Sequence, residues 1–166
     1  SEFESHGSVI QCKHCGREIR YLPDKRLEGI GFDFPFPYVA DWYEYQCKYV
    51  NSLDLLSMTD EPLYTEPCSL YEVILYKSKR LMAKKAVARL YCDRVVISYD
   101  AGELSYSFDD AGALTVLGKN KLNIYADGKV YQVRGDKRFN ALKYVNIYHR
   151  YKNLRKGDEN DKFLGL

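Results

Sequence analysis

Short runs of alternating hydrophobic and polar residues fill the chain from residue 70 almost to its end. Turn pairs such as Ala101-Gly102, Ala111-Gly112 and Asp127-Gly128 separate these runs. A period of two residues is typical of β-strands with one buried face, and an Asp-Gly pair between two such runs is a strong hairpin signal. The pattern predicts seven strands, over residues 70–76, 81–91, 95–99, 104–108, 113–117, 122–125 and 130–134.

After the last strand the period changes to that of a helix, over residues of about 137–153. Asp136 is a suitable N-cap and Gly157 a suitable stop. The predicted inner face consists of Phe139, Leu142, Val145, Tyr148 and Tyr151. Seven strands closed by a C-terminal helix are the layout of pleckstrin-homology and GRAM-like domains. We therefore predict an α+β fold, a seven-stranded β-barrel or sandwich capped by a helix, with a binding role rather than a catalytic one.

The first part of the chain has a different pattern. Residues 9–12 and 18–21 read as short strands that flank Cys12-Lys13-His14-Cys15-Gly16, which predicts a small zinc-knuckle-like hairpin. Residues 38–53 place mostly apolar side chains at spacings of three and four, as in an amphipathic helix. Residues 56–67 hold two prolines and read as a linker. These patterns predict two regions, an appendage at 1–69 and the pleckstrin-homology-like domain at 70–166.

Charge separates the same two regions. Residues 1–69 carry 6 Lys/Arg and 12 Asp/Glu, whereas residues 70–166 carry 19 and 11. The basic region could attract an anionic partner, or the two regions could attract each other. No apolar run is long enough to span a membrane, and the chain begins without methionine, so we expect a piece of a longer cytoplasmic protein that is peripheral to the membrane.

Two cysteines at the knuckle are candidate metal ligands. Thiolates at the spacing of Cys12 and Cys15 can hold one tetrahedral zinc ion, and a glycine after the second cysteine permits the tight turn. A structural zinc site would need two further ligands, for which the candidates are His6, Cys47 and Cys68. The alternative is a knuckle that keeps the hairpin and has lost the ion.

A run of cations lies where the first predicted strand turns into the second. Its members are Lys77, Lys79, Arg80, Lys84, Lys85 and Arg89, with no acidic residue among them. In pleckstrin-homology domains this connection binds phosphorylated headgroups, so the run predicts a lipid- or anion-binding site. The alternative is that alternate residues of a strand form an ordinary solvated face.

Catalytic motifs are missing from the sequence. It has no Gly-x-Ser-x-Gly elbow, no Walker loop, and no histidine followed by aspartate at the fifth position. Nucleic acid is a weaker expectation than an anionic membrane, because most of the 16 tyrosines fall at strand and helix positions that would fill a core.

Three stretches together resemble one family. They are residues 9–19 (VIQCKHCGREI), 40–46 (ADWYEYQ), and 116–125 (VLGKNKLNIY) continued at 129–146 (KVYQVRGDKRFNALKYVN). They resemble the C-terminal extension that follows the catalytic domain in some bacterial, Firmicute-type 1-acyl-sn-glycerol-3-phosphate acyltransferases. The resemblance implies a parent enzyme of phospholipid biosynthesis whose catalytic domain lies upstream. No position of this chain matches the catalytic motif of that family, so the resemblance implies no catalytic residue here.

Two functions follow as expectations. The first is a non-catalytic accessory region that positions a glycerophospholipid acyltransferase at anionic membrane or lipid headgroups. The second is a protein-interaction or assembly module that docks on the catalytic domain or forms a homo-oligomer.

Overall fold

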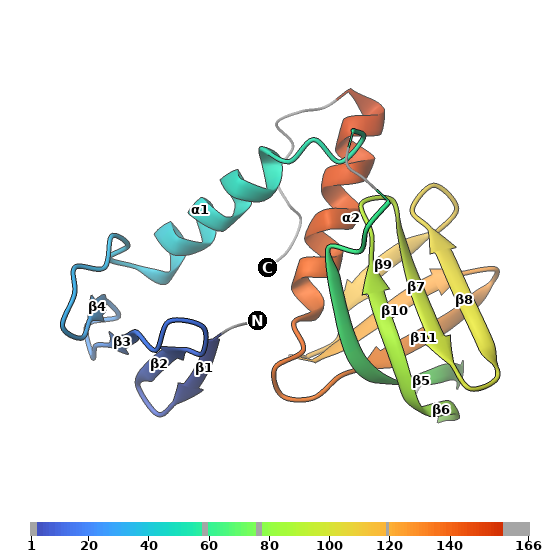
Figure 1. Cartoon of the computed structure of the whole chain (residues 1–166), viewed down its shortest axis with the longest axis horizontal. Coiled ribbons are helices and arrows are strands. Elements are labelled where there is room, and N and C mark those ends of the chain that lie inside the picture. The colour runs from blue at the N-terminus through green and yellow to red at the C-terminus, as the bar shows by residue number, and fades with distance from the viewer. Residues whose placement is uncertain (1–2, 58–59, 76–77, 119, 158–166) are drawn as a thin grey trace. The chain divides into compact units, whose positions relative to one another are not determined.

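The chain forms two compact units in the computed structural model, Ser1–Ser52 and Leu53–Leu166 (Figure 1). The structure describes residues 3–57, 60–75, 78–118 and 120–157. The boundary that the sequence suggests, between residues 69 and 70, falls inside the first strand of the second unit. Leu55 is buried, and Arg150 donates a hydrogen bond from Nε to the carbonyl oxygen of Leu53 at 3.1 Å. The segment at 53–57 is therefore part of the second unit rather than a linker.

The first unit contains a four-stranded antiparallel sheet followed by one helix. The strands, in sequence and in space, are β1 (Phe3–His6), β2 (Val9–Cys12), β3 (Glu18–Tyr21) and β4 (Leu27–Gly29). The two predicted strands that flank Cys12 to Gly16 are confirmed as β2 and β3 with the predicted bounds. The outer strands β1 and β4 were not predicted, because strands of three or four mostly exposed residues carry no clear alternation.

Helix α1 (Val39–Asn51) confirms the predicted amphipathic helix. Its start is fixed by the Tyr38 amide, which donates to the Asp41 carboxylate at 3.1 Å. Trp42 packs edge-on against the rings of Phe3 and Phe34, with centroids 5.1 and 5.3 Å away. No residue of α1 is fully buried, so much of its apolar surface is left uncovered by the first unit.

The second unit is a single curled antiparallel sheet of seven strands (Figure 1). The strands are β5 (Tyr64–Leu75), β6 (Ser78–Leu90), β7 (Arg94–Tyr99), β8 (Gly102–Ser107), β9 (Ala113–Val116), β10 (Lys121–Ala126) and β11 (Lys129–Arg134). Their order in the sheet is β8-β7-β6-β5-β11-β10-β9, so the first strand pairs with the last. All seven predicted strands are confirmed, as is the pleckstrin-homology-like fold class.

Strand β5 begins six residues before its predicted start. Its first part, residues 64–68, pairs with β6 alone, and pairing with β11 begins at Ser69. Pro67 therefore lies on a free edge, where a residue without an N–H is tolerated. The sequence prediction treated this proline as a sign of a linker.

The predicted Asp-Gly hairpin is confirmed between β10 and β11. Asp127 and Gly128 both have positive φ, 53° and 70°. Positive φ at both central residues is the requirement of a type I′ turn, whose twist matches that of the two strands.

Helix α2 (Ala141–Lys156) covers one end of the curled sheet (Figure 1). Its N-cap is Asn140, which accepts a hydrogen bond from the Leu142 amide at 3.1 Å, so the helix starts later than predicted. Asp136 caps the preceding turn instead, and accepts from the Arg138 amide at 2.7 Å. The helix ends at Gly157, with φ 73° as expected of a left-handed C-terminal glycine.

Aromatic side chains of α2 fill the end of the core. Tyr148 and Tyr151 lie against the Phe108 ring, with centroids 5.4 and 5.7 Å away, and Phe139 stacks on Tyr144. Of the predicted inner face only Leu142 is partly exposed. Among the described residues, no helix is long and apolar enough to cross a membrane.

Candidate anion-binding site

A β-bulge in β6 exposes two adjacent lysines. Cys68 pairs with Ala86 and Leu70 pairs with Ala83, so the single residue Ser69 lies opposite both Lys84 and Lys85. The Ser69 hydroxyl donates to the Lys84 carbonyl at 2.9 Å and holds this irregular step. In a regular strand two neighbours would point to opposite faces. Here both lysines are exposed, and neither forms an ion pair with a residue that the structure describes.

Three other predicted cations have partners within the sheet. Lys79 donates to the buried amide oxygen of Gln132, and Arg89 donates to the Ser98 hydroxyl at 2.6 Å. Arg80 forms an ion pair with Glu72. Lys77, the first cation of the predicted run, lies outside the described residues. The structure therefore divides the predicted cluster into an open lysine pair and cations that cross-link strands.

The pairing of β5 with both β6 and β11 brings a second cation to Arg80. We call the strand ends around it, residues 72–75, 78–80 and 126–129, the mouth. At the mouth the Lys129 ammonium lies 3.5 Å from Glu72 Oε1, while Arg80 holds Glu72 Oε2. Lys129 was missed by sequence reasoning, because only the pairing of β5 with β11 brings it beside β5.

Apolar side chains project from the same hairpin. Ile74, Leu75 and Leu81 have 57%, 76% and 52% of their surface exposed. They flank the β5–β6 connection together with the exposed cations Lys79 and Arg80. Single exposed apolar side chains are common, but three on one hairpin tip beside cations make an amphipathic surface.

The turn between β2 and β3 is closed by a backbone hydrogen bond and a left-handed glycine. The Gly16 amide donates to the Cys12 carbonyl at 2.8 Å, and Gly16 has φ 73°. Cys15 is exposed and Cys12 is half-buried. Among the described residues, no group of three or more His, Cys, Asp or Glu side chains is arranged to hold a metal ion.

The three further ligand candidates lie in different places. His6 pairs with Val9 whereas Cys12 pairs with Phe3, so His6 is three residues along the sheet, roughly 10 Å from Cys12. Cys47 lies on α1 and hydrogen-bonds with Tyr43. Cys68 is buried in the second unit, where burial raises the pKa of its thiol to about 11. That shift disfavours the thiolate that a metal needs.

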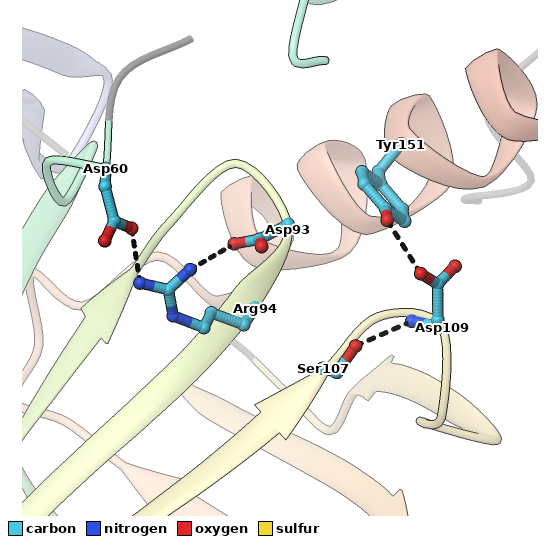
Figure 2. Close-up of polar contacts among 6 residues, drawn as sticks. All are labelled: Asp60, Asp93, Arg94, Ser107, Asp109 and Tyr151. Carbon is cyan, nitrogen blue, oxygen red and sulfur yellow. Dashed lines mark hydrogen bonds and ion pairs between the residues drawn. The ribbon is translucent and has the colours of Figure 1, made fainter. Parts of the chain in front are cut away.

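A cavity of about 240 Å³ lies at the end of the second unit that α2 covers. Its lining comprises Leu55, Leu56, Asp60, Cys92, Asp93, Arg94 and Tyr151. Figure 2 shows Arg94 between Asp60 and Asp93, and Tyr151 next to Asp109. The Tyr151 hydroxyl donates to Asp109 Oδ2 at 2.9 Å. Burial also raises the pKa of the Cys92 thiol. Because Arg94 already pairs with both carboxylates of the lining and Tyr151 belongs to α2, we interpret the cavity as part of the attachment of α2 to the sheet.

Comparisons with known proteins bear on the fold. No family model matches the chain, and no curated protein matches it. The chain is similar to the N-terminal PH domain of Vps36, with a TM-score of 0.44 and 16% identity over 58% of this chain and 82% of that one. It is also similar to the N-terminal PH domain of human ARAP2, with a TM-score of 0.43 and 11% identity over 66% of this chain and 96% of that one. At such identities the likeness concerns architecture alone, and the strand order given above carries the fold assignment.

Proposed function

We propose that the second unit binds anionic membrane through the β5–β6 hairpin. The observation that carries this proposal is the bulge, which directs Lys84 and Lys85 to solvent without partners among the described residues. A cation near an anionic leaflet gains roughly 1 kcal/mol. Neither lysine has to break an ion pair with a described residue before it binds lipid. Each can therefore contribute nearly all of this free energy.

The exposed tip supports a membrane rather than a soluble anion. Ile74, Leu75 and Leu81 could enter the interfacial layer while the cations stay at the headgroups. Apolar burial stabilises by about 25 cal/mol per Å² of surface, so three such side chains would add several kcal/mol at most. Together, the cations and the apolar side chains would bind the chain to the membrane surface reversibly.

Co-sedimentation with vesicles tests the membrane proposal. We expect binding of the full chain to rise with the fraction of anionic lipid and to fall with salt. Lys84→Glu/Lys85→Glu should weaken it strongly. The matched control is Lys121→Glu/Lys156→Glu, which makes the same change of charge on β10 and at the C-terminal end of α2, outside the β5–β6 hairpin, and should cost little. Binding that is equal in both variants, or independent of salt, would contradict the proposal.

We also propose the acyltransferase context. The support is the resemblance of residues 9–19, 40–46, 116–125 and 129–146 to the extension of 1-acyl-sn-glycerol-3-phosphate acyltransferases. In this context the chain is a cytoplasmic accessory region, peripheral to the membrane, of an enzyme whose chemistry lies upstream. The test is to find whether a His-x4-Asp domain precedes Ser1 in the reading frame. A reading frame that lacks one would remove this context.

An assembly role is the second candidate, favoured by the uncovered surface of α1. Val39, Tyr45 and Tyr49 are each at least half exposed on that helix. Light scattering over a range of concentrations tests for a homo-oligomer, and a pull-down with the separate upstream domain tests for docking. Tyr45→Ser/Tyr49→Ser should abolish either association. This role would be excluded if the chain stayed monomeric at every concentration and did not bind the separate upstream domain.

We further propose that the knuckle holds a structural zinc ion through Cys12 and Cys15. The support is the turn geometry at Gly16. Bound zinc would cross-link β2 and β3 and stabilise the small first unit. Metal analysis of the purified chain should give one zinc per chain, which Cys12→Ser and Cys15→Ser should each abolish. Metal-free protein with an unchanged melting temperature after zinc addition would refute it.

A further inference from the structure

Three rows of residues on the outer face of the second unit's sheet hold cations and no carboxylate. The pairing register defines these rows, each of which runs across neighbouring strands. The first row is Leu81, Tyr71, Gln132, Asn123 and Thr115, and the second is Lys79, Val73, Val130, Tyr125 and Ala113. The third is Lys84 and Lys85 opposite Ser69, followed by Arg134 and Lys121. We call these three rows the outer platform.

Alternation along the strands places the outer platform on the solvent side of the sheet. The residues next to it in the chain, such as Leu70 and Val133, are fully buried in the core. Tyr125 is 39% and Leu81 52% exposed, whereas the other apolar side chains of the first two rows are half-buried. The platform therefore presents apolar surface that projects little from the sheet.

A ladder of hydrogen bonds orders the centre of the outer platform. Gln132 is only 1% exposed, although it lies on the outer face. Its amide nitrogen donates to Asn123 Oδ1 at 2.6 Å, and its amide oxygen accepts from the Lys79 ammonium. These bonds fix three side chains before any partner binds, so less conformational entropy is lost on binding.

Two cations of the third row face each other directly. Arg134 on β11 pairs with Lys121 on β10. Like charges at directly opposite positions destabilise a sheet. Neither cation forms an ion pair with a residue that the structure describes, and the outer platform supplies no carboxylate. An anionic group placed over the pair would relieve this repulsion.

We propose that the outer platform docks an acidic amphipathic helix of a partner protein. The helix would lie along the rows, with its apolar side on Tyr71, Val73 and Tyr125 and one acidic flank over the third row. The rows lie about 7 Å apart, because two residues of a strand span that length, and a helix with its side chains is about 10–12 Å wide. Neighbouring strands are about 4.8 Å apart, close to the roughly 5.4 Å pitch of a helix. One carboxylate per turn can therefore meet Arg134 and then Lys121.

The shape of the outer platform favours a protein over other anionic partners. Apolar side chains that are half-buried in a sheet cannot insert between lipids, but a helix can pack against them and pair with cations at once. Single-stranded nucleic acid needs stacking rings, and of the two tyrosines on the platform only Tyr125 is exposed. The inference goes beyond the proposed function, which concerns the hairpin tip and α1, and shares with it only Leu81, Lys84 and Lys85.

Fluorescence anisotropy on the full chain tests the platform with synthetic helices. The matched probe is a labelled peptide of about 18 residues, with leucines along one side and one glutamate per turn along the adjacent flank. The control peptide has the same composition, with the glutamates on the side opposite the leucines. Because exposed ion pairs are individually weak, we expect the matched peptide to bind roughly five- to tenfold more tightly than the control peptide.

Charge variants locate the binding surface. Lys121→Glu/Arg134→Glu should weaken binding of the matched peptide by more than about tenfold, because attraction becomes repulsion. The control Lys25→Glu/Lys156→Glu changes two exposed cations outside the platform and should alter affinity by less than about twofold. Tyr125→Ser removes an apolar contact without changing charge and should weaken binding several-fold.

The variant Arg134→Gln separates binding from folding. It removes one of two opposed cations, so the melting temperature should rise by about 1–4 °C while the matched peptide binds more weakly. A residue that only maintains the sheet would not improve stability when it is replaced. Unchanged peptide affinity in folded Arg134→Gln would overturn the inference.

The remaining outcomes separate this inference from the proposed function. Loss of peptide binding in Lys121→Glu/Arg134→Glu, with vesicle binding intact, supports the platform whatever Lys84→Glu/Lys85→Glu does to vesicle binding. Loss of vesicle binding in the same variant would assign the platform to the membrane surface and overturn the inference. So would a uridine oligonucleotide that binds more tightly than the matched peptide, or equal binding of the matched and control peptides. If the double variant does not fold, as judged by its melting curve, unchanged affinity in Tyr125→Ser would overturn the inference.

Discussion

The attachment of α2 to the sheet gives a prediction whose size can be worked out from the structure. Tyr144 is fully buried, and its hydroxyl donates to Glu66 Oε2 on β5 at 2.9 Å. Burial raises the pKa of Tyr144, and the charge of Glu66 raises it further, so the hydroxyl stays a proton donor. Tyr144→Phe removes this hydrogen bond and leaves the ring in place.

The expected cost follows from the surroundings of the carboxylate. Hydrogen bonds to charged groups contribute about 1.5–3 kcal/mol. Glu66 is only 17% exposed, but it keeps an ion pair with Lys143 at 2.8 Å. We therefore expect the lower end, about 1.5–2 kcal/mol of unfolding free energy. Tyr151→Phe removes a bond of the same length to Asp109, which is 46% exposed, so water can replace the hydroxyl and the cost should stay below about 1 kcal/mol.

Urea unfolding of the full chain, followed by circular dichroism, measures both values. A double-mutant cycle with Glu66→Gln should show a coupling energy of about 1 kcal/mol between Tyr144 and Glu66. The reasoning would be refuted if Tyr144→Phe cost no more than Tyr151→Phe, or if the cycle gave no coupling.

Two further predictions concern the turn and the buried thiol. Gly128→Ala should cost about 1–2 kcal/mol in urea unfolding, because φ is 70° there; a cost below that of an exposed strand substitution would contradict the assigned turn. Cys68 should react with a thiol reagent far more slowly than Cys15 in the native chain and equally in denaturant. Folding raises the pKa of the Cys68 thiol from 9.0 to about 11. The contribution of this thiol to the free energy of unfolding is therefore complete below pH 9 and is lost as pH rises through 11. Cys68→Ala should therefore flatten the loss of stability over that range, and an unchanged slope would count against the burial of the thiol.

Much of the second unit could be predicted from the sequence, because its strands are long enough to show alternation and its turns carry strong signals. Asp127-Gly128 fixed one hairpin from two residues alone. The helix was predicted from its period, but Asp136 and Asn140 are both good caps, and only tertiary packing decides which one begins α2. Strands β1 and β4 escaped prediction because they are short and, apart from Leu27, bury no side chain fully.

The candidate site was predictable only in part. The run of cations can be read directly from the sequence. Which of them lack partners among the described residues depends on the register of β5 against β6. Two consecutive lysines would be assigned to opposite faces by alternation, and no local signal marks the bulge at Ser69. Lys129 joins Glu72 because the first and last strands of the sheet pair, which is a contact between residues far apart in the chain.

The bulge at Ser69 also affects how freely this hairpin can change. The extra residue is absorbed within β6, so exchanging Lys84 or Lys85 for other side chains alters surface chemistry while the pairs Cys68–Ala86 and Leu70–Ala83 stay in place. Loss of one of the two residues would remove the bulge, because Ser69 would then face a single residue and both flanking pairs would be kept. The hairpin can therefore accumulate substitutions at these two positions, and designers can graft new ligand preferences there, whereas a deletion would restore regular alternation and end the exposure of two adjacent side chains.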